Sequence, residues 1–171
     1  GIVISDNQNT FALERAVKAG IATAVIEARG ISKAQFEQEI LHGLKKAGVE
    51  FVVLAGFMRI LGPVFLAQAP GPVINIHPSL LPAFPGLHAQ AQALAYGVKV
   101  SGCTVHFVDE GMDTGPIIVQ RAVPVLDSDD EDSLAARILE QEHFLLPWVV
   151  GLLASDRIVL ENKKVRIRED Q

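Results

Sequence analysis

The sequence predicts an α/β fold with a mainly parallel sheet and helices on both faces. Short runs rich in β-branched residues alternate along the chain with segments of helical periodicity. That order is typical of βαβ units, whose right-handed crossovers make neighbouring strands parallel. In addition, residues 51–55 form an unbroken apolar run, which favours a strand that helices cover on both faces.

The composition indicates one domain and argues against some partners. The chain has 171 residues, of which 49% are hydrophobic, so it can bury a sizeable core. Its 15 Lys and Arg residues and 20 Asp and Glu residues give a net charge of −5. We therefore expect no nucleic-acid partner, because general binding to nucleic acid needs clustered cations.

Two further features bear on the compartment. The single cysteine, Cys103, excludes an internal disulfide and a multi-cysteine zinc site. The longest strongly apolar run, residues 144–154, contains a proline and a glycine and is shorter than the ~20 residues of a membrane-spanning helix. We expect a cytoplasmic protein with no membrane partner.

Each expected element has a local signal. Runs of β-branched and other apolar residues predict strands at residues 1–4, 21–26, 51–55, 72–76, 102–108 and 117–125. Helical spacing of apolar residues predicts helices at residues 11–18, 33–47, 64–69, 89–96 and 131–154. Thr10 and Ser32 are the expected N-caps of the first two helices, and Gly20 and Gly48 follow their ends.

The last helix and the tail carry signals of their own. Pro147 should bend or interrupt the helix. Apolar and charged residues alternate between residues 157 and 168, which predicts a hairpin that turns around Asn162.

Polar residues follow three of the predicted strands, where each apolar run ends. They lie in residues 55–59, 75–82 and 109–115. In α/β sheets ligands bind beyond the carboxyl ends of the strands. We therefore expect these three segments to outline one site.

Asn75 and His77 are the first candidates for chemistry in this site. They are two residues apart at the end of a strand, so their side chains leave the same face, and Pro78 keeps the backbone of His77 extended. An amide can donate to an oxygen that gains negative charge, and an imidazole can carry a proton. The alternative is a pair of ordinary polar residues at a strand end.

Asp113 is the third candidate, in a Gly-rich turn after another strand. Close to His77, its carboxylate would favour the protonated imidazole. The alternative is a turn aspartate that binds its own backbone, as is common in such turns. The triplet that Asp113 begins also occurs in aspartic proteases, but those are all-β proteins, and the βαβ pattern contradicts that interpretation.

The remaining polar candidates are less specific. His88 lies near a helix start and either contacts an anion or is exposed. His106 alternates with Thr104 along a strand, and its side chain either faces the site or packs against other side chains. Arg59 is a possible cation for an anionic ligand, and Glu142 on its own has the pattern of an exposed helix carboxylate. The scattered histidines have no metal-ligand spacing, so we predict no metal.

Residues 54–61, 74–82, 102–109 and 112–116 together carry a resemblance to a known family. They closely resemble the phosphoribosylglycinamide formyltransferases, the folate-dependent glycinamide ribonucleotide transformylases of purine biosynthesis. The similarity extends over nearly all of the chain. Residues 86–88 and 58–61 distinguish this member of the wider formyltransferase superfamily, and Pro78 stands where formyl-tetrahydrofolate deformylases usually have a second histidine.

The resemblance implies a Rossmann-like formyltransferase fold in a single domain over residues 1–171. It implies an enzyme that transfers the formyl group of 10-formyltetrahydrofolate to the primary amine of glycinamide ribonucleotide. Asn75 would stabilise the oxyanion, His77 would carry the proton, and Asp113 would keep His77 protonated. The family fold also suggests a cis Leu81–Pro82 peptide bond.

Binding residues follow from the same resemblance. Those expected around the folate are Lys33, Met58, Arg59, Ile60, Leu61, Asn75, Asp109, Glu110, Gly111, Met112 and Asp113. Those expected around the ribonucleotide are His88, Leu139, Glu140, Gln141 and Glu142, with Glu142 at the amine. Lys33 stands where members often have Arg, so its contact with a folate carboxylate would be monodentate.

The start of the chain departs from the family pattern. Members begin with a strand and a Ser-Gly-x-Gly-Ser-Asn loop that holds the substrate phosphate, whereas this chain begins at what resembles the second strand. The expectation is an N-terminally incomplete domain that lacks the first strand and the phosphate loop and binds the ribonucleotide weakly.

The alternatives to the transferase function are a formyl-tetrahydrofolate hydrolase and a fragment that binds folate without turnover. Either a monomer or a homodimer is expected.

Overall fold

The computed structural model describes residues 1–169. By its internal contacts the chain divides into two compact units, which are described separately. The first unit comprises residues 1–52 and 61–72, and the second comprises residues 53–60 and the chain from residue 73 onward. The single domain expected over residues 1–171 stays a prediction.

The first unit contains a two-stranded parallel sheet and three helices. Strands β1 (Ile2–Ser5) and β2 (Ala22–Val25) pair in parallel, as a βα connection through α1 (Phe11–Lys18) allows. Helices α2 (Lys33–Lys46) and α3 (Pro63–Gln68) pack against each other. The core side chains of these helices are Leu13, Ala16, Phe36, Ile40, Leu41, Leu44 and Phe65.

The two predicted N-caps of this unit behave differently. The Ser32 hydroxyl accepts from the Gln35 backbone N–H, and the Gln35 side chain accepts from the Ser32 N–H, which completes a capping box. Thr10 does precede α1, but its side chain makes no cap hydrogen bond. The Thr10 hydroxyl donates to the Ser5 hydroxyl at 3.3 Å, so Thr10 occupies the expected N-cap position but does not cap α1 through its side chain.

The second unit is built on a sheet with the strand order β3-β4-β5-β6. These strands are β3 (Val52–Leu54), β4 (Val73–His77), β5 (Val100–Phe107) and β6 (Ile117–Pro124). Strand β5 pairs antiparallel with both β4 and β6. The antiparallel pairing of β5 with β6 follows from their connection, a loop with no helix to carry the chain back across the sheet.

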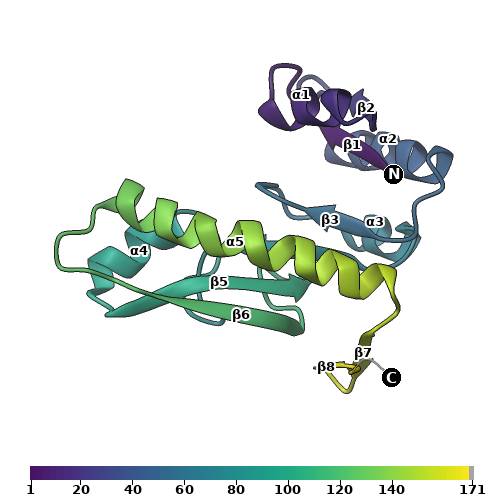
Figure 1. The fold of residues 1–171 in the computed structure, drawn as a ribbon. Coiled ribbons are helices and arrows are strands. Elements are labelled where there is room, and N and C mark those ends of the chain that lie inside the picture. The colour runs from purple at the N-terminus through teal and green to yellow at the C-terminus, as the bar shows by residue number, and fades with distance from the viewer. Residues whose placement is uncertain (170–171) are drawn as a thin grey trace. The chain divides into compact units, whose positions relative to one another are not determined.

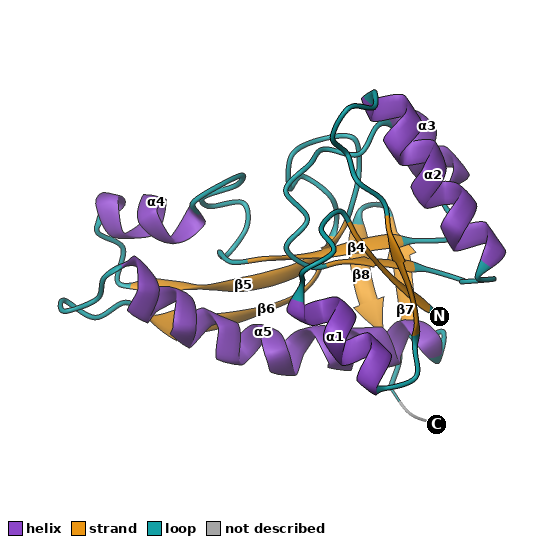
Figure 2. Ribbon diagram, turned by 90° about the horizontal axis from the view of Figure 1, so that it is seen from above, coloured by secondary structure: helices purple, strands orange, loops and turns teal. Residues whose placement is uncertain are grey.

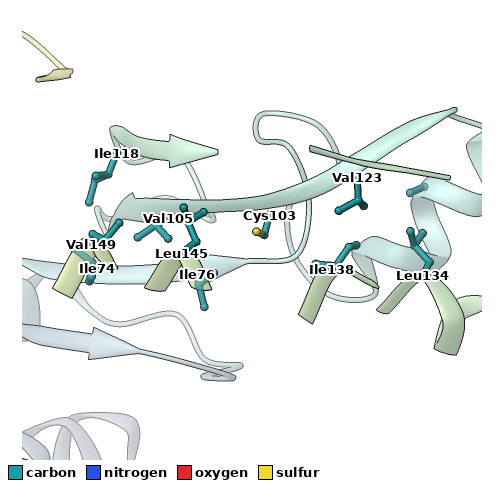
Figure 3. Packing of buried hydrophobic residues seen from close by; sticks show 11 residues of the cluster. Ile74, Ile76, Cys103, Val105, Ile118, Val123, Leu134, Ile138, Leu145 and Val149 are labelled. Carbon is teal, nitrogen blue, oxygen red and sulfur yellow. The ribbon is translucent and has the colours of Figure 1, made fainter. Parts of the chain in front are cut away.

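Helices α4 (Ala89–Tyr96) and α5 (Glu131–Ala154) have the predicted bounds. Helix α5 runs along β5 and β6 (Figure 1) and buries its apolar stripe against them. The cluster that results contains Ile74, Ile76, Ala93, Cys103, Val105, Ile118, Val123, Leu134, Ile138, Leu145 and Val149 (Figure 3). Cys103 is fully buried here, as expected of a small apolar side chain.

Helix α5 continues through Pro147 without interruption. Proline removes the hydrogen bond to the carbonyl four residues earlier, that of His143. Both residues are exposed, so water can replace the lost donor. Of the two expected outcomes at Pro147, a bend or an interruption, the interruption is therefore wrong.

Strands β7 (Ile158–Glu161) and β8 (Lys164–Ile167) form the predicted hairpin near the C-terminus (Figure 2). Asn162 and Lys163 have φ values of 49° and 65°. Positive φ at both central residues is typical of a type I′ turn, which Asn favours. No helix among the described residues is long and apolar enough to cross a membrane.

Two leucines of α5 test the importance of its buried stripe. Leu134 is 0% exposed and Leu139 is 46% exposed. Leu134→Ala should lower the free energy of unfolding by about 2–5 kcal/mol, because it leaves a cavity. Leu139→Ala should cost much less, since its side chain is already in contact with water. Urea denaturation of both variants measures the difference, and equal losses would contradict the packing of α5.

Candidate active site

The pairing of β4 with β5 brings four polar side chains to one face of the sheet. Asn75 lies opposite His106, and His77 lies opposite Thr104. Directly opposed residues of an antiparallel pair point to the same side. The four side chains therefore share a face, while the apolar residues between them point into the core that α5 covers.

His77 contacts an oxygen acceptor at each ring nitrogen. Its Nε2 lies 2.8 Å from the Phe84 carbonyl oxygen, and because a carbonyl only accepts, Nε2 carries the proton and donates. Its Nδ1 lies 3.4 Å from Oδ2 of Asp113. His77 is only 4% exposed, so both contacts lie in a largely dry environment.

Asp113 joins the loops that surround the two histidines. Its Oδ2 accepts from the Gly86 N–H at 2.8 Å, and its Oδ1 lies 3.6 Å from Nε2 of His106. The turn-aspartate alternative fits Asp109 better, because Oδ1 of Asp109 accepts from the Gly111 N–H and from the Thr114 hydroxyl. The structure thus brings Asn75, His77 and Asp113 together.

Gly86 allows the two loops to approach closely. Its φ is +80°, and a Cβ on this residue would lie 2.8 Å from the Met112 sulfur. Any larger residue would be strained and would push Met112 away. This glycine therefore lets residues 79–88 contact the loop that carries Asp113.

The sequence allows His106 either to face the site or to pack in the core, and the structure places it in the site. It is 2% exposed, and its Nδ1 lies 2.9 Å from the Phe107 carbonyl oxygen, to which it donates. Burial lowers the pKa of His106, although the Phe107 carbonyl and the charge of Asp113 act in the opposite direction. The ring is therefore neutral near pH 7, and its Nε2 accepts from the Asn75 amide at 3.3 Å. The signal that could have found it is its place opposite Asn75, which a known strand register would supply.

The expected folate residues fall in both units. Asp109, Glu110, Gly111 and Met112 precede Asp113 in the same loop, whereas Met58, Arg59 and Ile60 lie on an exposed segment after β3. Lys33 and Leu61 belong to the first unit. There Lys33 lies 3.7 Å from the buried carboxylate of Glu37, and the Leu61 side chain is buried.

The expected ribonucleotide residues lie on α4 and α5. His88 is exposed at the N-cap of α4 with a φ of 58°, and its side chain makes no cap hydrogen bond. Leu139 and Glu140 are exposed, and Gln141 is half-buried. Within residues 1–169 no group of three or more His, Cys, Asp or Glu side chains could hold a metal ion.

Glu142 differs from the exposed carboxylate that its sequence context indicated. It is half-buried on α5, between the buried Ile138 and Leu145, and burial raises the pKa of its carboxyl group. Burial, with a smaller effect of the Glu142 charge, also raises the pKa of Cys103 to about 11. Glu142 thus lies on α5, the helix that packs against β5 and β6.

Comparison with known proteins gives consistent matches. The family described as "Formyl transferase" matches residues 1–150. The trifunctional purine biosynthetic protein adenosine-3 of Drosophila pseudoobscura pseudoobscura is 54% identical over 166 residues, which are 95% of this chain and 12% of that protein. The chain thus spans only a small part of that relative. The phosphoribosylglycinamide formyltransferase of Escherichia coli K12 is 45% identical over 157 residues, 91% of this chain and 74% of that protein.

Solved structures give the same result for the fold. The crystal structure of glycinamide ribonucleotide transformylase 1 from Symbiobacterium toebii superposes with a TM-score of 0.95 at 47% identity, over 99% of this chain and 80% of that one. The predicted fold class, an α/β protein with a mainly parallel sheet, is confirmed by this likeness.

The raised pKa of Glu142 predicts a pH-dependent stability. The folded chain keeps a proton on this carboxyl group at pH values where the unfolded chain loses it. The contribution of Glu142 to stability therefore becomes less favourable as the pH rises above 4.5, the ordinary pKa of a glutamate side chain. Glu142→Gln should raise Tm at pH 8 and leave it nearly unchanged at pH 4.

Thermal unfolding at both pH values measures this effect, with Glu140→Gln on the exposed face of α5 as the control. A gain at pH 4 as large as that at pH 8 would mean that ionisation of Glu142 is not the cause.

Proposed function

Because this chain belongs to the formyl transferase family, we propose that it transfers the formyl group of 10-formyltetrahydrofolate to the primary amine of glycinamide ribonucleotide. The family resemblance stated from the sequence motifs is confirmed. Relatives and solved structures named for this activity support the proposal. The observation in the chain itself that carries it is the approach of Asn75, His77 and Asp113 on one face.

The side chains of Asn75, His77 and Asp113 suit acyl transfer to an amine. The reaction joins the amine nitrogen to the formyl carbon and breaks the bond from that carbon to N10 of the folate, while one proton passes from the amine to N10. Asn75 donates an N–H to the formyl oxygen as that oxygen gains charge. Its amide nitrogen already donates to the neutral His106 ring, which leaves the second N–H of the same nitrogen available.

His77 carries the proton, and the geometry favours Nδ1 as the nitrogen that exchanges it. Nε2 is engaged with the Phe84 carbonyl at 2.8 Å. Nδ1 is 3.4 Å from Asp113, longer than the ~2.7–3.2 Å of an ordinary hydrogen bond. Asp113 balances the positive charge on the ring whenever His77 holds the extra proton.

The binding residues keep the roles that the family resemblance implies. Asp109 to Asp113 and Met58 to Ile60, in the second unit, bind the folate. The folate contacts of Lys33 and Leu61, in the first unit, stay predictions from the family resemblance. His88, at the start of α4, and Leu139 to Glu142, on α5, bind the ribonucleotide. The cytoplasmic location and the monomeric or homodimeric state stay predictions from the sequence.

An assay of formyl transfer tests the activity directly. The chain is mixed with 10-formyltetrahydrofolate, with and without glycinamide ribonucleotide, and both formate and the formylated amine are measured. We expect tetrahydrofolate to form only when the amine is present. Formate release that ignores the amine would instead indicate the hydrolase. Calorimetric binding of folate with no turnover would indicate a domain that only binds.

Substitutions in the cluster test the proposed roles. His77→Ala and Asn75→Ala should each lower kcat by about 10²–10⁴-fold, because proton transfer and oxyanion stabilisation act mainly in the transition state. Asp113→Asn should lower kcat as well, since it removes the charge opposite His77. The control is His42→Ala, at an exposed position on α2. An effect of Asn75→Ala on KM alone would rule out its role at the oxyanion.

A further inference from the structure

A polar network lies beneath the loop of residues 79–88. Gln120 on β6 donates from Nε2 to the Leu81 carbonyl oxygen at 2.8 Å and to the Thr104 hydroxyl at 2.9 Å. The Thr104 hydroxyl also accepts from the Leu81 N–H at 3.1 Å and donates to the Ser79 carbonyl oxygen at 2.7 Å. Two strands of the sheet thereby hold the start of the loop.

The chemistry of the groups determines the direction of each hydrogen bond. The Ser79 and Leu81 carbonyl oxygens can only accept, so the single hydroxyl hydrogen of Thr104 goes to Ser79. Both acceptor positions of that hydroxyl are then occupied, by Leu81 and Gln120. The two hydrogens of the Gln120 amide nitrogen match its two acceptors. All four hydrogen bonds therefore form together in one arrangement. The opposite orientation of the Gln120 amide would place its oxygen against the Leu81 carbonyl oxygen, where neither group can donate.

The network continues to the catalytic histidine through the same loop. The Ser79 hydroxyl lies within hydrogen-bonding distance of the Ala83 carbonyl oxygen at 2.5 Å and of the Phe84 carbonyl oxygen at 3.3 Å. Phe84 has a φ of 53°, a strained value for a non-glycine residue that neighbouring contacts must maintain. The Phe84 carbonyl in turn accepts from Nε2 of His77.

We propose that Gln120 is a positioning residue that holds the Phe84 carbonyl against Nε2 of His77 through Thr104, Leu81 and Ser79. Gln120 itself is exposed on β6, so it adds little to the apolar core, and its amide N–H groups make its contacts with the loop. Its removal loosens the loop at Leu81 and at the Thr104 hydroxyl. The Phe84 carbonyl then holds the His77 ring less firmly. The consequence for turnover rests on the formyl transfer proposed above, whereas the consequence for the ring does not.

Two substitutions separate the hydrogen bonds from the shape of the side chain. Gln120→Met keeps the length of the side chain and removes both donors. Gln120→Glu keeps the shape and places a carboxylate against two acceptors, so it should have the larger effect. Gln68→Met, at an exposed position on α3, is the matched control. Circular dichroism first establishes that each variant is folded.

The first measurement follows the His77 ring and needs no activity. In protein labelled with ¹⁵N-histidine, the exchange of the His77 Nε2–H with water is measured by NMR. We expect exchange about tenfold faster in Gln120→Met, the size of effect that the loss of one hydrogen bond produces, and no change in Gln68→Met. Unchanged exchange in both Gln120 variants would overturn the proposal.

The second measurement is a double-mutant comparison with His77→Ala. Gln120→Met should lower kcat about tenfold with little change in KM. In the His77→Ala background the same substitution should cause no further loss, because its effect passes through the ring. Equal losses in both backgrounds would show that Gln120 acts elsewhere and would overturn the proposal. If the unsubstituted chain has no formyl transfer, the proposed function fails, and the exchange measurement alone decides the role of Gln120.

Discussion

The antiparallel register between β4 and β5 is the constraint on which the site depends. It sets Asn75 opposite His106 and His77 opposite Thr104. The same register turns Ile76 and Val105 to the other face, into the core beneath α5. A slip of one residue would exchange the two faces, exposing the core and burying the polar side chains without partners. The energy of the apolar core thus maintains the geometry of the polar cluster.

Burial makes the contacts of this cluster strong and specific. His77 and His106 are almost fully buried, and Asp113 lies between them. In such an environment each polar group needs a partner. The backbone carbonyls of Phe84 and Phe107 provide partners for the two rings. The neutral His106 ring accepts from the Asn75 amide, whereas the His77 ring faces the Asp113 carboxylate. The two neighbouring histidines therefore have different chemistry.

Local signals predicted most of the elements but not their pairing. The capping box at Ser32, the turn at Asn162 and the bounds of α4 and α5 depend on residues close in sequence. The same local signals did not predict that the Thr10 side chain makes no cap hydrogen bond, or that α5 continues through Pro147. The antiparallel pairing of strands in the second unit also depends on which strand lies beside which. Hydrophobic periodicity does not predict this pairing, because it is the same for a parallel and an antiparallel strand.

The sequence by itself determined that Asn75 and His77 share a face, because the alternation of side chains along a strand is local. With the family motifs it also indicated Asp113 and the chemistry of the site. Only the tertiary structure decided that His106 orients Asn75, that Gly86 binds Asp113, and that Gln120 supports the loop beside His77. These contacts join residues 27 to 39 positions apart. Their formation depends on strand order, register and loop path, which are set by packing of the whole unit and leave no periodic signal in the chain.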